Sequence, residues 1–289
     1  DDPEKLGTVI EGVPVLGPTR ALSKIALAED VAEVILALPH YADTNVAPAV
    51  IRAYESGIRV TRMADLYEAA TGRVPIQREG SYWYADLPLD RQPSSAAFAV
   101  KRCVDVAVAL VGLVVLALVL PAAAVAIKLS SPGPIFYRQV RIGRLGRPFS
   151  LVKFRSMVVE AEQDGRARLA QRGDPRATRL GRLMRRSRFD ELPQFWSVLR
   201  GDMSLVGPRP ERPEVGAILQ GEWAAFRSRL LVKPGLTGWS QVNMSYASTQ
   251  EQMLPKLQYD LYYIKHWSLL LDFLILVRTV GVVLRLSGT

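Results

Sequence analysis

The sequence predicts a chain of two parts: an α/β amino-terminal domain built on a parallel sheet, and a membrane-associated body that begins with an apolar helix. Three observations support this. Apolar runs alternate with helical patterns in residues 1–75, and all 22 residues from Val106 to Ile127 are apolar, Gly or Pro. The charge is also divided. Residues 1–100 carry 9 Lys+Arg and 14 Asp+Glu, a net charge of −5, whereas residues 101–289 carry 28 and 14, a net charge of +14.

Residues 1–75 have the pattern of a β-α-β-α unit, which is typical of a parallel sheet. The predicted elements are strands at Val13–Leu16, Glu33–Leu38 and Ile58–Thr61, a helix from about Thr44 to Ser56, and a helix ending at Gly72. The sequence contains neither G-x-G-x-x-G nor G-x-x-x-x-G-K-[ST], so nucleotide binding here lacks its usual phosphate-binding loop. The pattern starts without a first strand, and we interpret the domain as truncated.

Residues 76–100 separate this domain from the rest of the chain. Pro88, Pro93, Ser94 and Ser95 predict a linker that leads to the membrane segment. With 289 residues, of which 49% are hydrophobic, the chain has enough apolar content for folded domains on both sides of this linker. That content excludes a disordered tail or a coiled rod.

The apolar run at 106–127 is long enough to cross the hydrocarbon core of a bilayer, and a simple spanning helix is one interpretation. Two features favour another. The positive-inside rule places both ends on the cytoplasmic side, because basic residues flank each of them: Lys101, Arg102, Lys128, Arg138, Arg141 and Arg144. Pro121, preceded by Leu120, removes a helix hydrogen bond and favours a bend. Residues 101–130 are therefore predicted to form a re-entrant helix bent at Leu120-Pro121, with the freed carbonyl groups needing partners in the bilayer.

The stretch from Arg138 to Arg188 is strongly basic, with 15 Lys/Arg against 4 Asp/Glu. One interpretation is a solvated or lipid-facing surface. Nucleic-acid binding is disfavoured, because few aromatic residues are interleaved and an apolar segment lies next to it. One Cys and two His exclude an intrachain disulfide and a Cys-cluster zinc site. Chemistry must therefore depend on Asp, Glu, Lys and Arg.

Two adjacent carboxylates, Asp190 and Glu191, follow three arginines. Asp190 suits the N-cap of a helix that has Pro193 in its first turn and Gly201 past its end. The same position can also hold a phosphate group, because a helix amino terminus with nearby arginines favours anions. Adjacent helical side chains point about 100° apart, so the two carboxylates must differ in role. One could attack a phosphate while the other moves a proton.

Two Pro/Gly-rich segments follow. Gly207-Pro208-Arg209-Pro210 fixes an arginine between prolines, which suits phosphate binding or a structural turn. The segment from Lys233 to Trp239 reads as a type II turn centred on Pro234 and Gly235, used in a buried corner or a ligand-binding loop. At the end of the chain, residues 267–286 carry charged side chains in an apolar run, which predicts a helix in the membrane interface or against the protein.

From about Lys101 to the end, these residues resemble the bacterial sugar transferases, the monotopic phosphoglycosyl transferase family of polyprenyl-phosphate hexose-1-phosphate transferases. The resemblance depends on motifs in a fixed order after the apolar segment: Ser131-Pro132-Gly133-Pro134-Ile135-Phe136, Lys153-Phe154-Arg155-Ser156-Met157, Asp190-Glu191-Leu192-Pro193-Gln194, Gly201 to Pro210, Lys233 to Trp239, and Tyr259-Asp260-Leu261-Tyr262-Tyr263. Residues 1–75 look like the degenerate nucleotide-binding-type domain of the long members.

This resemblance implies a fold and an activity. Residues 1–75 would be an incomplete Rossmann-like domain for regulation or dimerisation, and residues 131–289 a mainly α catalytic domain with an interfacial C-terminal helix. The implied reaction transfers a sugar-1-phosphate from a UDP-sugar to undecaprenyl phosphate, releasing UMP through a covalent aspartyl-phosphosugar. Such a step begins exopolysaccharide, O-antigen or capsule-type glycan synthesis.

The resemblance also implies roles for particular residues. Asp190 would be the nucleophile and the Mg²⁺ ligand, with Glu191 as its dyad partner. The phosphate- and substrate-binding positions would be Lys153, Arg185, Arg209, Gln194, Asp202, Thr237 and Gln241. A carboxylate attacks a diphosphate poorly unless cations offset the repulsion, and the arginines and Mg²⁺ would supply that help.

The expected location is the cytoplasmic face of the bacterial inner membrane, with phospholipid as a partner, a homodimer as the assembly and no nucleic acid. The sequence departs from the family pattern in three places: Leu120 precedes the proline where small members have Ser, Ser197 replaces Asn, and Met244-Ser245 replaces Gly-Arg. The alternative function is a catalytically inactive scaffold that binds anionic lipid. A conventional glycosyltransferase would release UDP, and the absence of an Asp-x-Asp pair disfavours its metal-dependent form.

Overall fold

A computed structural model describes residues 3–37, 46–76, 94–158, 174–244 and 252–285. The chain divides into two compact units, Asp1–Pro75 and Ile76–Thr289, and each is described by itself. Most of the predicted linker at 76–100 lies outside the described residues, as do Leu38, Thr44 and Ser245, which end or begin predicted segments.

The first unit contains a short parallel sheet. Strands β3 and β4 pair in parallel, with Glu33 opposite Arg59 and Leu36 opposite Arg62, and helix α2 lies between them in the chain. The parallel pairing predicted for these strands is confirmed. Its elements are η1 (Pro3–Lys5), β1 (Val9–Ile10), β2 (Val13–Pro14), η2 (Thr19–Ala21), α1 (Leu22–Ala28), β3 (Glu33–Leu36), α2 (Ala47–Glu55), β4 (Arg59–Arg62) and α3 (Met63–Thr71).

The strand predicted at Val13–Leu16 is not part of that parallel sheet. Only Val13–Pro14 is extended, and it pairs antiparallel with β1. The reason is the two-residue turn between them, where Glu11 and Gly12 both have positive φ values, 50° and 83°. Two consecutive positive φ values are typical of a type I′ hairpin turn, whose twist matches that of an antiparallel pair.

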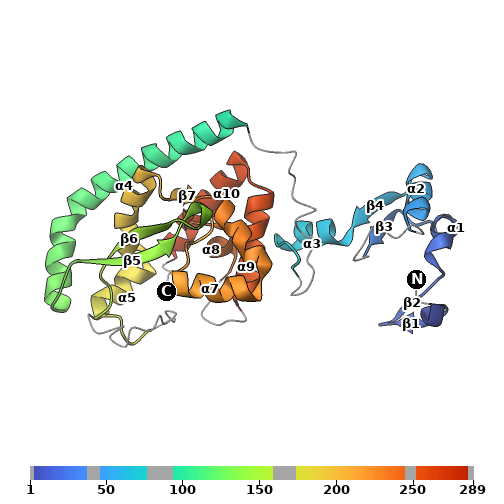
Figure 1. Cartoon of the computed structure of the whole chain (residues 1–289), viewed down its shortest axis with the longest axis horizontal. Coiled ribbons are helices and arrows are strands. Elements are labelled where there is room, and N and C mark those ends of the chain that lie inside the picture. The colour runs from blue at the N-terminus through green and yellow to red at the C-terminus, as the bar shows by residue number, and fades with distance from the viewer. Residues whose placement is uncertain (1–2, 38–45, 77–93, 159–173, 245–251, 286–289) are drawn as a thin grey trace. The chain divides into compact units, whose positions relative to one another are not determined.

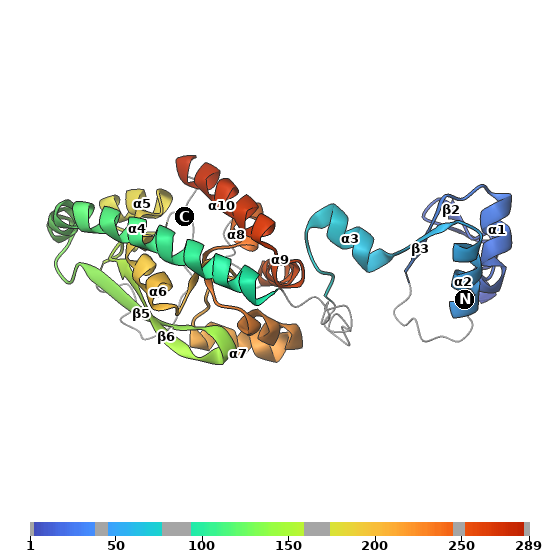
Figure 2. The same cartoon turned by 90° about the horizontal axis from the view of Figure 1, so that it is seen from above.

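The second unit is mainly helical, as predicted, and its long helix α4 is shown in green in Figures 1 and 2. Its elements are α4 (Ser95–Ser130), β5 (Phe136–Ile142), η4 (Arg144–Gly146), β6 (Pro148–Phe154), α5 (Arg179–Arg186), η6 (Phe189–Gln194), α6 (Phe195–Arg200), β7 (Ser204–Val206), α7 (Pro213–Glu222), η7 (Ala224–Leu231), β8 (Gly235–Thr237), α8 (Trp239–Asn243), α9 (Met253–Lys265) and α10 (Leu269–Leu284). Strands β5 and β6 form an antiparallel hairpin, and β7 and β8 a short parallel pair.

Helix α4 is long and apolar enough to cross a membrane by its length and composition. It begins with Ser94, whose side chain accepts a hydrogen bond from the Ala97 backbone N–H as an N-cap. The helix continues through Leu120 and Pro121 to Ser130, so the predicted bend does not interrupt it. Figure 1 shows its ribbon curving along the rest of the unit.

One face of α4 contacts the body of the unit near its start, middle and end. Arg102 donates hydrogen bonds to the carbonyl oxygens of Val198 and Leu199, each at 2.7 Å. A Cβ added at Gly112 would lie 2.4 Å from the Phe195 ring, which shows how closely the helix approaches α6. Near the other end, Ile127 is buried against Phe154 and Met184. The opposite face exposes apolar side chains, among them Val104, Val108, Val111, Val114, Leu118, Val125 and Leu129.

The core of this unit joins α4, the short strands and the C-terminal helices. It contains Ala109, Leu151, Val198, Met203, Leu205, Val206, Trp239, Tyr259, Tyr263 and Ile275. A buried polar cluster fastens the start of α4 to α10: Asp272 accepts hydrogen bonds from Lys101 (2.6 Å), Tyr263 (2.8 Å) and Trp267 (3.2 Å). Because a buried carboxylate needs such partners, this cluster fixes how α4 and α10 sit together.

The prediction of a type II turn at Pro234-Gly235 is wrong. That turn requires a positive φ at Gly235, but Gly235 is extended and begins β8 opposite Ser204. Glycine is needed there because β7 and β8 approach closely at this point. An added Cβ would lie 2.1 Å from the Gly207 backbone nitrogen and 2.4 Å from the Thr237 carbonyl oxygen.

We therefore expect Gly235→Ala to destabilise the protein by about 2 kcal/mol or more, because backbone atoms cannot move aside without separating β7 from β8. Gly221→Ala in α7 is the matched control. An added Cβ there meets nothing within 4 Å, so the better helix former should stabilise by about 0.5–1 kcal/mol. Thermal unfolding of both variants in detergent checks this pair, and a Gly235→Ala protein as stable as the parent would contradict it.

Candidate active site

The carboxylate pair lies on η6, a short 3₁₀ helix between α5 and α6 that packs against β6 and α4. Asp190 and Glu191 are both buried. The prediction that Asp190 is an N-cap is wrong: the N-cap of η6 is Arg188, and the α-helix begins only at Phe195. Pro193 lies inside the 3₁₀ helix, where its missing N–H is compatible with the tighter turn. The predicted end of this segment at Gly201 is confirmed, with a left-handed φ of 91°.

Glu191 lies among three cationic side chains. Its Oε1 atom accepts a hydrogen bond from Arg209 Nη2 at 2.8 Å, with Arg188 Nη1 at 3.5 Å and Lys153 Nζ at 3.9 Å. Burial alone would raise the pKa of Glu191. Arg209, Arg188 and Lys153 outweigh that effect and hold the pKa well below its usual range. Glu191 is therefore ionised, and its Oε1 atom interacts with all three cationic side chains.

Asp190 has a different environment from its neighbour. Within the described ranges no hydrogen bond or ion pair joins its carboxylate to another residue. Burial, followed by repulsion from Glu191, raises its pKa to about 6, although Lys153, Arg188 and Arg209 act in the opposite direction. At neutral pH the carboxylate is mostly ionised and its oxygen atoms are not engaged. The two adjacent carboxylates thus have different environments, one bonded to cations and the other without a described partner.

Lys153 completes the cluster from strand β6. Burial, and then repulsion from Arg209, lowers its pKa to about 8, against the opposing influence of Glu191 and Asp190. The cluster thus holds three cations around two carboxylates in a buried setting, and such a surplus of positive charge favours an anionic ligand.

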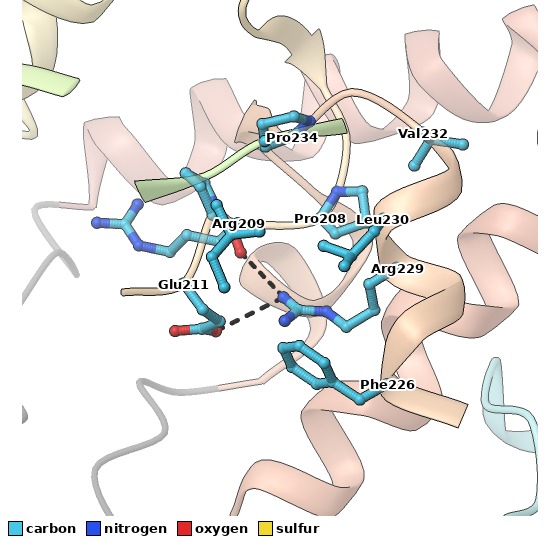
Figure 3. Close-up of a pocket in the computed structure, with 11 residues that line it drawn as sticks. Pro208, Arg209, Glu211, Phe226, Arg229, Leu230, Val232 and Pro234 are labelled. Carbon is cyan, nitrogen blue, oxygen red and sulfur yellow. Dashed lines mark hydrogen bonds and ion pairs between the residues drawn. The ribbon is translucent and has the colours of Figure 1, made fainter. Parts of the chain in front are cut away.

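Arg209 is held by its backbone as well as by its side chain, and Figure 3 shows the backbone contact. Its carbonyl oxygen accepts a hydrogen bond from Arg229 Nη2 at 2.9 Å. Arg229 in turn lies 2.8 Å from Asp260 Oδ2 through its Nε atom and 3.6 Å from Glu211 through its Nη2 atom. Lys256 also contacts Glu211. This buried network fixes the loop between β7 and α7 so that the Arg209 guanidinium reaches Glu191.

The other predicted site residues lie on neighbouring elements. Arg185 is in the last turn of α5, and Gln194, 2% exposed, ends η6 with a buried Nε2 atom that no described group bonds. Asp202 pairs with Arg200 at 3.3 Å, and Thr237 shares a hydrogen bond of 2.7 Å with Thr279 of α10. Gln241 donates to the Leu236 carbonyl. The structure thus brings together Lys153, Asp190, Glu191 and Arg209, with Gln194 on the same short helix.

Two important residues were missed from the sequence. Arg188 was counted only as part of the basic stretch, although its position two residues before Asp190 was a usable signal. Arg229 had no signal at all, because its partners Arg209 and Asp260 are 20 and 31 positions away in the chain. Only the folded structure brings these groups together.

The donor set fits the expected Mg²⁺ ion at Asp190. No group of three or more His, Cys, Asp or Glu side chains suited to a metal occurs within the described residues. Mg²⁺ is commonly held by one or two carboxylates while substrate phosphates and water supply the remaining ligands. Asp190 offers unengaged oxygen atoms for this, whereas Oε1 of Glu191 is already bonded to Arg209. A single carboxylate ligand shared with a phosphate substrate is consistent with this arrangement.

Fold and site together define a protein with one long apolar helix and a buried carboxylate pair surrounded by cations. The family described as bacterial sugar transferase matches residues 96–286, and the chain belongs to that family.

Its relatives carry related names. The chain is 40% identical over 231 residues to a UDP-N-acetylgalactosamine-undecaprenyl-phosphate N-acetylgalactosaminephosphotransferase of Aeromonas hydrophila, covering 80% of this chain and 53% of that protein. It is 36% identical over 272 residues to a UDP-glucose:undecaprenyl-phosphate glucose-1-phosphate transferase of Xanthomonas campestris pv. campestris, covering 93% and 56%. An Escherichia coli K12 protein with the same name as the latter is 42% identical over 182 residues, covering 62% and 39%. The chain spans about half the length of the first two relatives.

The raised pKa of Asp190 predicts a stability effect. Below about pH 4 the carboxyl is protonated in both the folded and the unfolded chain, so its burial costs little. The free energy of unfolding falls as the pH rises from about 4 towards 6, because the unfolded chain ionises this carboxyl more easily than the folded one. Above about pH 6 the full loss of stability is reached, at most about 3 kcal/mol. Asp190→Asn should therefore raise the melting temperature at pH 7.5 in magnesium-free buffer, with a gain that shrinks towards pH 4. An equal gain at both pH values would contradict this.

Proposed function

We propose that this chain transfers a sugar-1-phosphate from a UDP-sugar to undecaprenyl phosphate. The observation that carries the proposal is the asymmetry of the carboxylate pair: Glu191 is bonded to Arg209, whereas the Asp190 carboxylate is unengaged within the described residues. The names of the relatives support the substrates. They differ in the sugar, so the sugar is left to experiment.

The proposed reaction has two displacements at one phosphorus atom. An Asp190 oxygen attacks the sugar-linked phosphate of the donor, forming an Asp–O–P bond while the bridging P–O bond breaks and UMP leaves with its electron pair. A phosphate oxygen of undecaprenyl phosphate then attacks the same phosphorus, and the Asp–O–P bond breaks to release undecaprenyl-diphosphosugar. Phosphoryl transfer depends mainly on positioning and electrostatic stabilisation, which the surrounding cations supply.

Each residue of the cluster has a part in this scheme. Glu191 keeps Arg209 and Lys153 beside Asp190, and these cations offset the repulsion between the attacking carboxylate and the diphosphate. Arg209 can engage phosphate oxygens in a bidentate manner, whereas Lys153 acts as a point charge. Arg185, Gln194, Asp202, Thr237 and Gln241 are proposed to contact the rest of the substrates. A bound Mg²⁺ at Asp190 would supply further charge neutralisation at the phosphates.

We expect wild-type protein to release UMP, and no UDP, from a UDP-sugar when Mg²⁺ and undecaprenyl phosphate are present. Asp190→Asn should abolish UMP release, because the amide is no nucleophile. Glu191→Gln should reduce the rate by at least about tenfold, because it loosens Arg209. A panel of UDP-sugars, with UMP measured by chromatography, tests this and identifies the sugar.

The matched control is Glu214→Gln, which changes an exposed carboxylate on α7 and should leave UMP release unchanged. Full activity of Asp190→Asn would overturn the mechanism. Release of UDP would instead identify a conventional glycosyltransferase, and the absence of any product with every sugar would favour a lipid-binding scaffold.

We further propose that α4 is re-entrant, with both ends on the cytoplasmic face of the inner membrane. A straight span would separate its ends by about 30 Å of hydrocarbon. Yet Arg102 near one end bonds to α6, while Arg155, directly after β6, donates to the carbonyl oxygens of Ser131 (2.6 Å) and Pro132 (2.7 Å) just past the other end. Both ends are thus fastened to one body. The exposed apolar side chains of α4 and α10 would face lipid.

Cysteine labelling tests this topology in a Cys103→Ser background. Ala96→Cys and Arg147→Cys are exposed positions on either side of the apolar segment. In oriented membrane vesicles a membrane-impermeant maleimide should label both from the cytoplasmic side only. Labelling from opposite sides would establish a spanning helix.

We propose that residues 1–75 form an incomplete Rossmann-like unit with a regulatory or dimerisation role. The β3-α2-β4 arrangement, with its parallel pair and its small core of Ala26, Ala53 and Ile58, supports this assignment.

A further inference from the structure

Arg188 has a backbone conformation that is unusual for its residue type. It follows α5 and has φ 58° and ψ 15°, in the left-handed region. A residue just past a helix end in this conformation is usually glycine, because a side chain there is strained. Elsewhere glycine takes this position after α2, α3 and α6, at Gly57, Gly72 and Gly201. After α1 the position is taken by Asp30, φ 51°, a residue type that tolerates the left-handed region better than most. At the helix end beside the carboxylate pair the chain places an arginine instead.

The guanidinium group of Arg188 is mostly buried but makes few hydrogen bonds with the described residues. Its side chain is 23% exposed, and its Nη1 atom lies 3.5 Å from Glu191 Oε1, a long contact. The same oxygen already accepts a hydrogen bond from Arg209 at 2.8 Å. No other acceptor for Arg188 is found within the described part of the chain. An arginine has five N–H donors, so most of those on the Arg188 guanidinium have no acceptor among the described residues.

The position of Arg188 explains what those donors could bind. It precedes Asp190 by two residues, and its charge acts on both Asp190 and Glu191. Lys153 lies on the same cluster, 3.9 Å from Glu191. Strained conformations that persist in folded proteins gather at functional sites, and a partly buried cation with unused donors favours an anionic ligand.

We propose that Arg188 binds the sugar-linked phosphate of the donor nucleotide while Asp190 attacks it. This inference rests on the proposed function of the site. The guanidinium donates to the non-bridging oxygens of the transferring phosphate, where negative charge must be stabilised as the Asp–O–P bond forms and the bond to UMP breaks. The strained backbone at position 188 is kept because glycine there would lack this cation.

The Arg188→Gly variant distinguishes the effect of the backbone conformation from that of the side chain. It removes the strain at φ 58°, so the variant should be at least as thermostable as wild type. It also removes the cation, so kcat/KM for the UDP-sugar should fall roughly ten- to a hundredfold, the range for one lost charge-assisted hydrogen bond. The direct measurement is the rate of the first UMP burst without undecaprenyl phosphate, because that burst reports the step at Asp190.

Two further variants make the test specific. Leu145→Gly changes another left-handed non-glycine position of the same unit, φ 57°, and should leave the burst rate unchanged. Arg188→Lys should recover part of the rate lost in Arg188→Gly, because it restores a positive charge without the planar guanidinium.

The outcomes are distinct. A wild-type burst rate in Arg188→Gly would overturn the inference. So would a normal burst with a raised KM for undecaprenyl phosphate alone, because Arg188 would then bind the acceptor. A lower melting temperature with equal loss in Arg188→Gly and Arg188→Lys would indicate a structural role and also overturn it. Failure of the proposed function would show differently, as the absence of any UMP burst in wild type.

Discussion

The ion pair between Glu191 and Arg209 is the interaction on which the rest of the site depends. A buried carboxylate must be paired, and Arg209 reaches Glu191 at 2.8 Å only because its loop is fixed by Arg229 and Asp260. The neighbouring Asp190 has no hydrogen-bonding partner among the described residues, and burial, followed by repulsion from Glu191, raises its pKa to about 6. The burial that makes the pair costly for folding is also what gives the two carboxylates different pKa values.

A second constraint connects the apolar helix to that site. Arg102 binds the carbonyl groups near the end of α6, and α6 directly continues η6, which carries the carboxylate pair. At the other end, Arg155 binds Ser131 and Pro132 and lies two residues from Lys153. Each end of α4 is thus bonded to a segment that directly follows an element with a site residue: α6 follows η6, and Arg155 follows β6. The long apolar helix and the carboxylate site therefore belong to one packed body, so a displacement of the helix would be transmitted to the site.

Local sequence signals predicted some features well and others poorly. The parallel pairing of β3 and β4, the long apolar helix and the helix end at Gly201 follow from periodicity and from glycine preference, which are local properties. The N-cap at Asp190 and the turn at Gly235 were wrong. At Asp190 a 3₁₀ turn displaces the helix start to Phe195, and at Gly235 a neighbouring strand, not a turn, requires the glycine. The second error comes from a contact with a distant part of the chain, Gly207.

The sequence by itself determined the chemical parts of this protein: an apolar segment, a basic body, an adjacent carboxylate pair and two Pro/Gly-rich segments. Only the tertiary structure decided how they act. It placed three cations around Glu191, whereas no described residue forms a hydrogen bond or ion pair with the Asp190 carboxylate, and it brought Arg188 next to Glu191. The reason is physical: burial and long-range ion pairs set the ionisation of each group, and neither can be read from residues that are adjacent only in the chain.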